Sequence, residues 1–424
     1  MRKREFARAL RHGLGAAYLH VKEYGDSGVE KHLLNACLKD LVYDGQIDSG
    51  RAGWLARMLD RTGRIEKYAE AIHAALTAES SGEEWDLEQL VQLACELFER
   101  GFGEFKDVLL GLAQDKQDSI GQITLGEALI DVAGLTGFAV AADKMVRTGA
   151  DNWEKHSLYE YACRSCGNAE EVDTFIGSQF WSDVQVEIAD RQQPVATSSR
   201  EPLSLAQVLD VIENGEKPER EHYRCRVFGR TATDEELLIV ADRLEKEKDP
   251  LRLYAYLAVF WNRPLPVASP KVIRHLFSEN ADIRRSARNA LSMVRSSAVR
   301  KAALKALKSD TEDLIVSGLN LLKLNYQKND LGILTSGLGR LENVNQIHWG
   351  ARAATGIAER SNDVALSGVL AWVYEYTPCG LCRGGALNRL IQWGTAPAQV
   401  LYEAQWDAEE DTRRMARAVL KASS

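Results

Sequence analysis

Apolar residues recur at intervals of three and four along nearly the whole chain, and Leu and Ala fill most of these positions. Because an α-helix turns once in about 3.6 residues, this spacing places the apolar side chains on one face of a helix. Segments in which Val, Ile or Thr alternate with polar residues, as they do in half-buried strands, are scarce. The pattern predicts an all-α protein.

The helical pattern itself repeats along the chain. In the second half, small residues that mark comparable helices follow one another at intervals of 32, 30, 34, 35 and 30 residues, at Ala255, Ala287, Ser317, Ala351, Ala386 and Ala416. A looser series in the first half has intervals of 35, 35 and 33 residues, at Leu55, Leu90, Leu125 and Leu158. Such an interval fits two helices and two turns, and a pair that short cannot bury its own apolar face. The period predicts an α-solenoid of stacked antiparallel helix pairs.

The segment Asp-Ile-Arg-Arg-Ser-Ala-Arg-Asn-Ala-Leu at 282–291 resembles the second helix of the HEAT-repeat family. Asp249 to Ala258 and Asp411 to Ala416 are similar, so the resemblance is most specific over about 249–420. We expect the Asp to cap each helix and the small residues to let neighbouring helices approach. The pattern departs where Leu314 and His348 replace the Arg. The resemblance implies HEAT-like repeats of about 30–35 residues in an elongated scaffold that binds macromolecules on its surface.

One interruption divides the helical pattern. Two prolines and three Ser or Thr lie between Arg191 and Ser204. We therefore expect a helical-repeat region at 1–190, a linker or long loop at 191–204, and a HEAT-like repeat region at 205–424. A surface insertion within one continuous solenoid explains the same segment equally well.

Charge is distributed unevenly along the chain. The net charge is −8, from 53 Lys and Arg against 61 Asp and Glu, which does not favour a dedicated nucleic-acid binder. Residues 271–308, however, hold ten Lys and Arg against two acids. The candidate binding residues in this basic segment are Arg284, Arg285, Arg288, Arg295, Arg300, Lys301, Lys305 and Lys308. They attract an acidic ligand unless acids of adjacent repeats neutralise them.

Two Cys-x-x-Cys pairs raise the question of thiol or metal chemistry. We expect Cys163 and Cys166 at the C-terminus of a helix that Asp151 or Asn152 caps and Gly167 ends. Thr377 and Pro378 resemble an N-cap and a first helical residue, which would place Cys379 and Cys382 in a first turn, where the helix dipole favours thiolate.

Three interpretations of these pairs remain open. A redox motif of this kind normally follows a strand, and none is predicted. A zinc ion shared by all four cysteines requires a solenoid to bring repeats about six apart together, although each repeat touches only its neighbours. The third interpretation, which we favour, is that they are small, packed, reduced residues, as we also expect for Cys37, Cys95 and Cys225.

No phosphate-binding loop, dinucleotide fingerprint, nucleophile elbow or H-E-x-x-H motif occurs. We therefore expect no catalytic residue, no bound metal and no cofactor, and interpret His348 as a packed or surface histidine. The basic start of the chain has no signal-peptide core, no window has the roughly 18–20 apolar residues of a membrane span, and seven cysteines suggest a reducing compartment. These features predict a cytoplasmic protein with no membrane contact.

The function predicted from the sequence is a non-enzymatic interaction scaffold that binds a protein partner through the solenoid surface. The first alternative is a nucleic-acid-binding protein that contacts phosphates through the basic segment. The second is an enzyme that resembles the HEAT-like alkylpurine DNA glycosylases, which use an Asp and aromatic residues on a concave basic surface. Tryptophans are available for that role, but no residue of the catalytic motif can be matched here.

Overall fold

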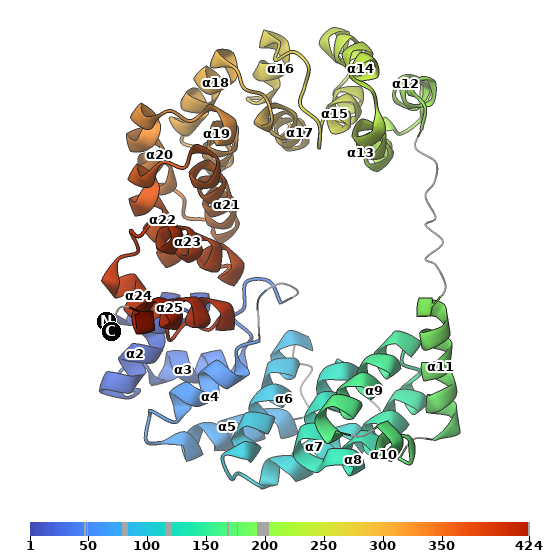
Figure 1. The fold of residues 1–424 in the computed structure, drawn as a ribbon, viewed down its shortest axis with the longest axis vertical. Coiled ribbons are helices and arrows are strands. Elements are labelled where there is room, and N and C mark those ends of the chain that lie inside the picture. The colour runs from blue at the N-terminus through green and yellow to red at the C-terminus, as the bar shows by residue number, and fades with distance from the viewer. Residues whose placement is uncertain are drawn as a thin grey trace. The chain divides into compact units, whose positions relative to one another are not determined.

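The structure is a computed structural model that describes residues 1–45, 48, 50–78, 84–114, 121–167, 169–175, 177–192 and 203–422. Over these residues the chain is helical, and no strand occurs among them (Figure 1). The all-α prediction is confirmed. Most of the predicted linker, residues 193–202, lies outside the described residues.

The chain divides into two compact units. The first comprises Met1–Thr197 together with Leu401–Ser424, and the second comprises Ser198–Val400. The sequence analysis grouped 205–424 as one region, whereas the last 24 residues belong with the N-terminal helices.

Contacts within the first unit explain this grouping. The backbone N–H of Ala408 donates to the carbonyl oxygen of Gly13 at 2.8 Å. Trp54 Nε1 donates to the carbonyl oxygen of Trp406 at 2.9 Å, and the Trp406 ring stacks on Tyr18 with centroids 4.7 Å apart. The C-terminal segment therefore completes the core of the unit that the N-terminus begins.

Many helices of the first unit pack against a neighbour along the chain or against the next helix but one, and α6 does both, with α7 and α8. The helices of this unit follow in chain order. They are α1 (Lys3–His12), α2 (Gly15–Tyr24), α3 (Glu30–Leu38), α4 (Ala52–Leu59), α5 (Ile65–Thr77), α6 (Glu84–Glu99), α7 (Glu104–Gln114), α8 (Gln122–Thr148), α9 (Asn152–Cys166), α10 (Ala169–Asp173), α11 (Ser178–Gln192) and α25 (Glu410–Ala422).

Helix α8 is long and apolar enough to cross a membrane by length and composition, with a mean hydropathy of 1.5 over 18 residues. The expectation that no window reaches this length and composition was therefore wrong. The backbone leaves the helical region at Gly134, with φ 57° and ψ −138°, so two shorter helices meet there. A β-carbon at Gly137 would lie 1.9 Å from the Leu129 carbonyl oxygen, so the two halves pack closely, and α8 contacts α6, α7 and α9.

The second unit has two rows of helices (Figure 1). In one row α13, α15, α17, α19, α21 and α23 contact one another in succession, and in the other row α14, α16, α18 and α20 do the same. The helices are α12 (Leu205–Asn214), α13 (His222–Thr231), α14 (Asp234–Lys246), α15 (Pro250–Val259), α16 (Pro270–His275), α17 (Ala281–Ser292), α18 (Ser297–Leu307), α19 (Glu312–Asn325), α20 (Leu331–Leu338), α21 (Val344–Ser361), α22 (Ser367–Tyr376) and α23 (Gly380–Gln392), with 3₁₀ turns η1 (Pro218–Glu221), η2 (Lys328–Asp330) and η3 (Val364–Leu366); α24 (Ala398–Ala404) spans the boundary.

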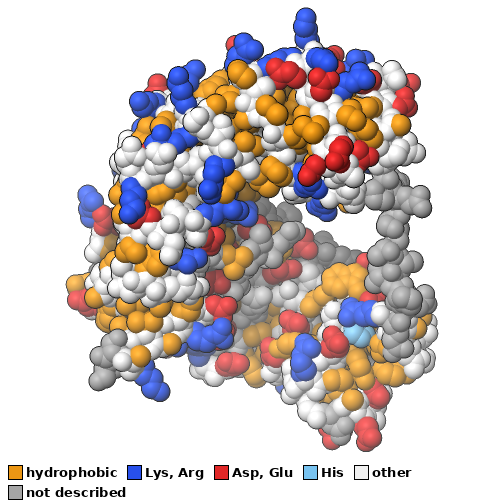
Figure 2. Space-filling model, turned by 45° about the horizontal axis from the view of Figure 1, so that its top comes forward, with side chains coloured by type: hydrophobic (Ala, Val, Ile, Leu, Met, Phe, Trp, Pro, Cys, Tyr) orange, Lys and Arg blue, Asp and Glu red, His pale blue; other side chains and the backbone are white. Residues whose placement is uncertain are grey.

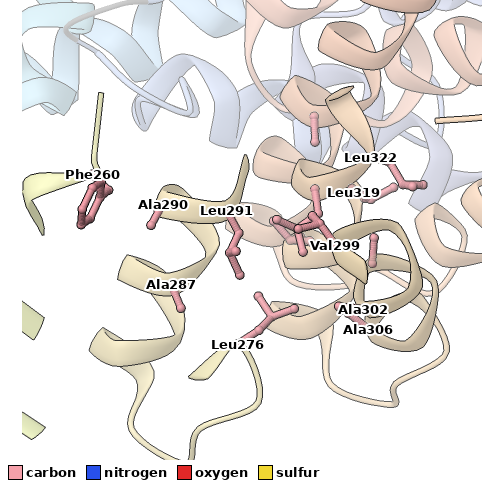
Figure 3. Packing of buried hydrophobic residues seen from close by; sticks show 14 of the residues in the cluster. Phe260, Leu276, Ala287, Ala290, Leu291, Val299, Ala302, Ala306, Leu319 and Leu322 are labelled. Atoms are coloured by element: carbon pink, nitrogen blue, oxygen red, sulfur yellow. The ribbon is translucent and has the colours of Figure 1, made fainter. Parts of the chain in front are cut away.

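The six small residues that defined the period lie on every second helix, from α15 to α25, and all are at most 1% exposed. Small or absent side chains let these helices approach one another closely. A β-carbon at Gly229 of α13, for example, would lie 1.9 Å from the Val259 carbonyl oxygen of α15. Figure 3 shows the result in α17, where Ala287, Ala290 and Leu291 face the neighbouring elements of the core.

The helix caps match the expected pattern only in part. Asp249 caps α15, because its side chain accepts hydrogen bonds from the backbone of Leu251 and Arg252. In α17 the N-cap is Asn280, and Asp282 lies in the first turn instead. The cap expected from Asp282 was therefore wrong by two residues, although a carboxylate in the first turn still suits the helix dipole.

Candidate functional site

The predicted basic segment lies on both rows of the second unit. Arg284, Arg285 and Arg288 belong to α17, and Arg300, Lys301 and Lys305 belong to α18. Arg295 lies in the turn between these helices, and Lys308 follows α18 directly. The structure therefore does not gather the eight residues on one face.

The arginines of α17 face an acid of α19. Arg284 Nε donates to Asp313 Oδ2 at 3.0 Å, and Arg288 Nη1 lies 3.9 Å from Asp313 Oδ1. Arg284 also donates to the carbonyl oxygens of Ser278 and Glu279, both at 2.8 Å. Burial lowers the pKa of Arg288, and the nearby Asp313 carboxylate opposes that effect. Both guanidinium groups are thus engaged within the unit.

Arg300 is engaged in the same way one helix later. Its guanidinium donates through Nε to Asp330 Oδ2 at 3.1 Å and through Nη2 to Asp330 Oδ1. The Asp330 side chain is only 3% exposed, so this two-point pair is largely removed from water. Three of the eight basic residues are therefore neutralised by acids about one repeat away.

The lysines of α18 form the rim of a groove with α16. This groove, which we call the α16–α18 groove, has a volume of about 720 Å³. Its described lining includes five Lys or Arg and no acid: Pro270, Ile273, Arg274, Phe277, Ser297, Ala298, Arg300, Lys301, Ala302, Leu304, Lys305 and Lys308. Figure 2 shows basic and hydrophobic side chains side by side over this part of the second unit.

The groove offers two kinds of contact. Ile273, Phe277 and Leu304 are half-buried and present apolar surface. Lys301 and Lys305 are exposed, and the Lys305 ammonium lies 4.5 Å from the centre of the Phe277 ring. In the described part of the chain, no ion pair engages either lysine, so the groove can bind a ligand that carries both apolar and acidic groups.

Of the three cysteines outside the two pairs, Cys37 and Cys225 are buried, as predicted, and Cys95 is half-buried. All seven cysteines are free thiols, and Cys37 and Cys225 are fully buried. Burial raises the pKa of Cys37, Cys95 and Cys225 to about 12, which leaves them protonated and unreactive at neutral pH.

The first cysteine pair lies where the sequence placed it. Helix α9 begins after the Asp151 capping box and ends at Gly167, whose φ of 81° is the left-handed conformation that favours glycine. Burial raises the pKa of Cys163. Cys163 and Cys166 belong to the first unit, and Cys379 and Cys382 belong to the second.

The second pair starts a helix, but not in the predicted register. Thr377 ends α22, and Cys379 is itself the N-cap of α23. The prediction that Thr377 and Pro378 begin the helix was therefore wrong by two residues. The new register places Cys382 in the first turn, one turn above Cys379.

His348 completes a group with this pair, which the sequence analysis did not foresee. Its Nδ1 atom lies 3.8 Å from Cys382 Sγ, and one ligand atom each from His348, Cys379 and Cys382 lie within 4.8 Å of one another. The pKa of Cys379 is lowered by its contact with the Cys382 thiol and, more weakly, by the His348 ring. The pKa of Cys382 is raised by the same contact between the two cysteines. We call this group the His348–Cys379–Cys382 cluster.

The spacing in the sequence held a signal for this group. His348 and Cys382 are 34 residues apart, close to the length of one period, and they lie near the starts of α21 and α23. His348 also stands where the repeat pattern departs from Arg. Because neighbouring repeats stack, residues one period apart become neighbours in space.

Comparisons of the chain with protein-family models, with curated proteins and with solved structures found no match.

Proposed function

We propose that the chain is an α-solenoid of HEAT-like repeats that serves as a non-enzymatic scaffold in the cytoplasm and binds a protein partner in the α16–α18 groove. The two rows of successive helix contacts and the small residues on alternate helices support the solenoid. Seven free thiols suit a reducing compartment. The observation that carries the binding proposal is the groove itself, with its apolar floor and basic rim.

The partner presents a segment in which Asp or Glu flanks apolar side chains. Leu or Phe side chains of such a segment cover Ile273, Phe277 and Leu304, and its carboxylates pair with Lys301 and Lys305. Charge complementarity of this kind favours encounter and fixes orientation, while apolar burial supplies most of the affinity.

A protein segment fits the groove better than nucleic acid does. Phosphate binding relies on Arg and Lys that are available to the backbone of the nucleic acid. Of the five basic residues that line the groove, Arg300 is already held by Asp330. The apolar floor gains nothing from a phosphate, whereas an amphipathic segment uses both floor and rim.

The test measures binding of fluorescent peptides to the full chain by anisotropy. The probe is an amphipathic peptide with Leu and Phe on one face and Glu along its flank, and the comparison peptide carries Lys in place of Glu. We expect the acidic peptide to bind. We expect the double variant Lys301→Glu with Lys305→Glu to weaken binding by at least roughly tenfold, because two attractive pairs become repulsive.

The matched control is Lys248→Glu, which reverses an exposed charge of the same unit outside the groove. It should leave the affinity unchanged. The proposal fails if both peptides bind equally, or if K301E/K305E has the affinity of the control. Binding of a DNA or RNA oligonucleotide that weakens steeply with salt, without binding of the acidic peptide, supports the nucleic-acid alternative instead.

A further inference from the structure

The His348–Cys379–Cys382 cluster lies in the second unit, apart from the lining of the groove. It combines the two side-chain types that bind zinc most often, thiolate and imidazole. We propose that His348, Cys379 and Cys382 bind one Zn²⁺ ion. This inference does not depend on the proposed function.

The distances between the ligand atoms agree with a tetrahedral ion. Bonds of about 2.3 Å to sulfur and about 2.05 Å to nitrogen place neighbouring ligand atoms roughly 3.5–3.8 Å apart. Cys382 Sγ and His348 Nδ1 are 3.8 Å apart, and all three ligand atoms fall within 4.8 Å of one another. Side-chain rotations that bring the ligand atoms closer by no more than about 1 Å close the remainder.

The backbone fixes the three ligands on two neighbouring helices of one row. Cys379 and Cys382 are separated by a single turn at the start of α23, and His348 lies on α21, which packs against α23. Cys379 is 3% exposed, whereas Cys382 and His348 are half-buried, so an ion can enter from the side of these two residues. The site is therefore both held in place and reachable.

An unsatisfied hydroxyl borders the cluster. The Thr377 side chain is fully buried and interacts with the Cys382 thiol, but its Oγ1 has no hydrogen bond of normal geometry in the described chain. Buried hydroxyls rarely lack a partner. A metal-bound thiolate is a stronger acceptor than a thiol, so the bound ion would give the Thr377 O–H a partner.

The charge of the site suits a dication. Two thiolates cancel the charge of Zn²⁺, so the nearby Arg352 does not repel the complex. Each thiol that becomes a ligand gives its proton to solvent. Three protein ligands leave a fourth position for water, as in zinc sites that are not closed.

A disulfide accounts for the geometry less well than a metal does. A bond between Cys379 and Cys382 would use the two sulfur atoms and leave His348 without a function in the group. The convergence of a third ligand atom from the neighbouring repeat is what metal coordination requires. Both outcomes can be distinguished by experiment.

The test measures the zinc content of the full chain after purification with Zn²⁺ and exhaustive dialysis. We expect one zinc per chain in the native protein and none in the double variant Cys379→Ser with Cys382→Ser. We expect His348→Ala to lower the affinity for zinc by at least roughly a hundredfold. Loss of a residue that only hydrogen-bonds to a metal ligand already costs up to about a hundredfold, and loss of a direct ligand should cost at least as much. The control, Cys163→Ser with Cys166→Ser, removes the other Cys-x-x-Cys pair and should retain one zinc.

A second readout does not depend on the folding of any variant. Co²⁺ added to the metal-free native chain should produce thiolate-to-cobalt charge-transfer absorption and the visible bands of a tetrahedral ion, and Zn²⁺ should abolish both. Native chain without zinc and without these bands overturns the proposal, as does zinc content that follows Cys163 and Cys166. Loss of both free thiols to a disulfide under the same conditions overturns it as well.

Discussion

Lys323 lies in α19 with most of its side chain removed from water. Burial lowers its pKa to about 8, and the positive charges of Arg352, Arg360 and Arg288 add to the effect. Since the ordinary value is 10.5, the unfolded chain holds this proton more tightly than the folded chain does. The charged lysine therefore destabilises the second unit below pH 8, and the penalty is relieved as the pH rises from 8 toward 10.5.

The first prediction concerns this residue. Lys323→Met should raise the free energy of unfolding at pH 7 by about 1–3 kcal/mol, because it keeps the apolar stem and removes the buried charge. Urea unfolding at pH 7 and at pH 10 measures the effect. The gain should shrink at pH 10, where the native lysine is largely neutral in the folded chain.

Lys328→Met, at an exposed position of η2, is the control for that prediction. It should change the stability by no more than about 0.5 kcal/mol at either pH. A gain for Lys323→Met that is independent of pH would contradict the assignment of the effect to a buried charge.

At the scale of elements, polar side chains connect helices that are one repeat apart. Asn325 of α19 is the clearest example, because its Oδ1 accepts from the Ser296 backbone at 2.9 Å and its Nδ2 donates to the Val294 carbonyl oxygen at 2.8 Å. These bonds span 29 and 31 residues of sequence. The side chain is 7% exposed, so it fixes the turn before α18 in a place that water reaches poorly.

The second prediction follows from this contact. Asn325→Ala should lower the free energy of unfolding by about 2–4 kcal/mol, because it leaves a backbone N–H and a carbonyl oxygen without partners. Hydrogen exchange at the Ser296 amide should accelerate. The control is Asn320→Ala on the same helix, whose amide donates only to the Val316 carbonyl oxygen of its own helix, and it should cost less than about 1 kcal/mol. Equal costs at both positions would refute the role given to Asn325.

At the scale of the whole molecule, the first unit is built from both ends of the chain. A β-carbon at Gly15 of α2 would lie 1.9 Å from the Glu403 carbonyl oxygen, which shows how closely the C-terminal segment approaches the N-terminal helices. Together with the contacts of Trp406, this approach makes residues 401–422 part of the first core rather than an extension of the second unit.

The third prediction tests that assignment. Gly15→Val should displace the C-terminal segment and lower the stability of the first unit by about 2–4 kcal/mol, since backbone atoms cannot yield to the new side chain. Hydrogen exchange should accelerate in α25 and in α2, and remain unchanged in α17 to α21. Gly111→Val, which meets open space, is the control. Unchanged exchange in α25 of the Gly15 variant would show that the segment is not part of this core.

The all-α character could be predicted from the sequence because the helical spacing of apolar residues recurs along it. Ala255, Ala287 and Ala351 recur at nearly constant spacing, and each marks a helix of the same row, since backbone approach at those points requires a small side chain. The place of residues 401–424 could not be predicted in this way. A period describes contacts between neighbouring repeats and says nothing about which core a terminal repeat joins.

The sites could be predicted less completely. The density of basic residues in the sequence identified Arg284, Arg288 and Arg300 as candidates. It could not show that Asp313 and Asp330 pair with them, because these acids lie 25 to 30 residues further along the chain. Four of the predicted residues, Arg300, Lys301, Lys305 and Lys308, line the groove. The contact of His348 with Cys382 could not be predicted from the residues next to His348 in the sequence, because Cys382 lies 34 residues further along the chain.

The measurement that tests the scaffold most directly compares proteins captured from nuclease-treated lysate by three tagged full-length chains: native, K301E/K305E and K248E. The proposal predicts a protein that is retained at constant stoichiometry by the native chain and K248E, is lost from K301E/K305E, and contains an acidic amphipathic segment that binds the purified chain by itself. The same proteins at the same amounts on all three chains would contradict the proposal. So would nucleic acid that co-purifies before nuclease treatment and leaves no protein partner after it.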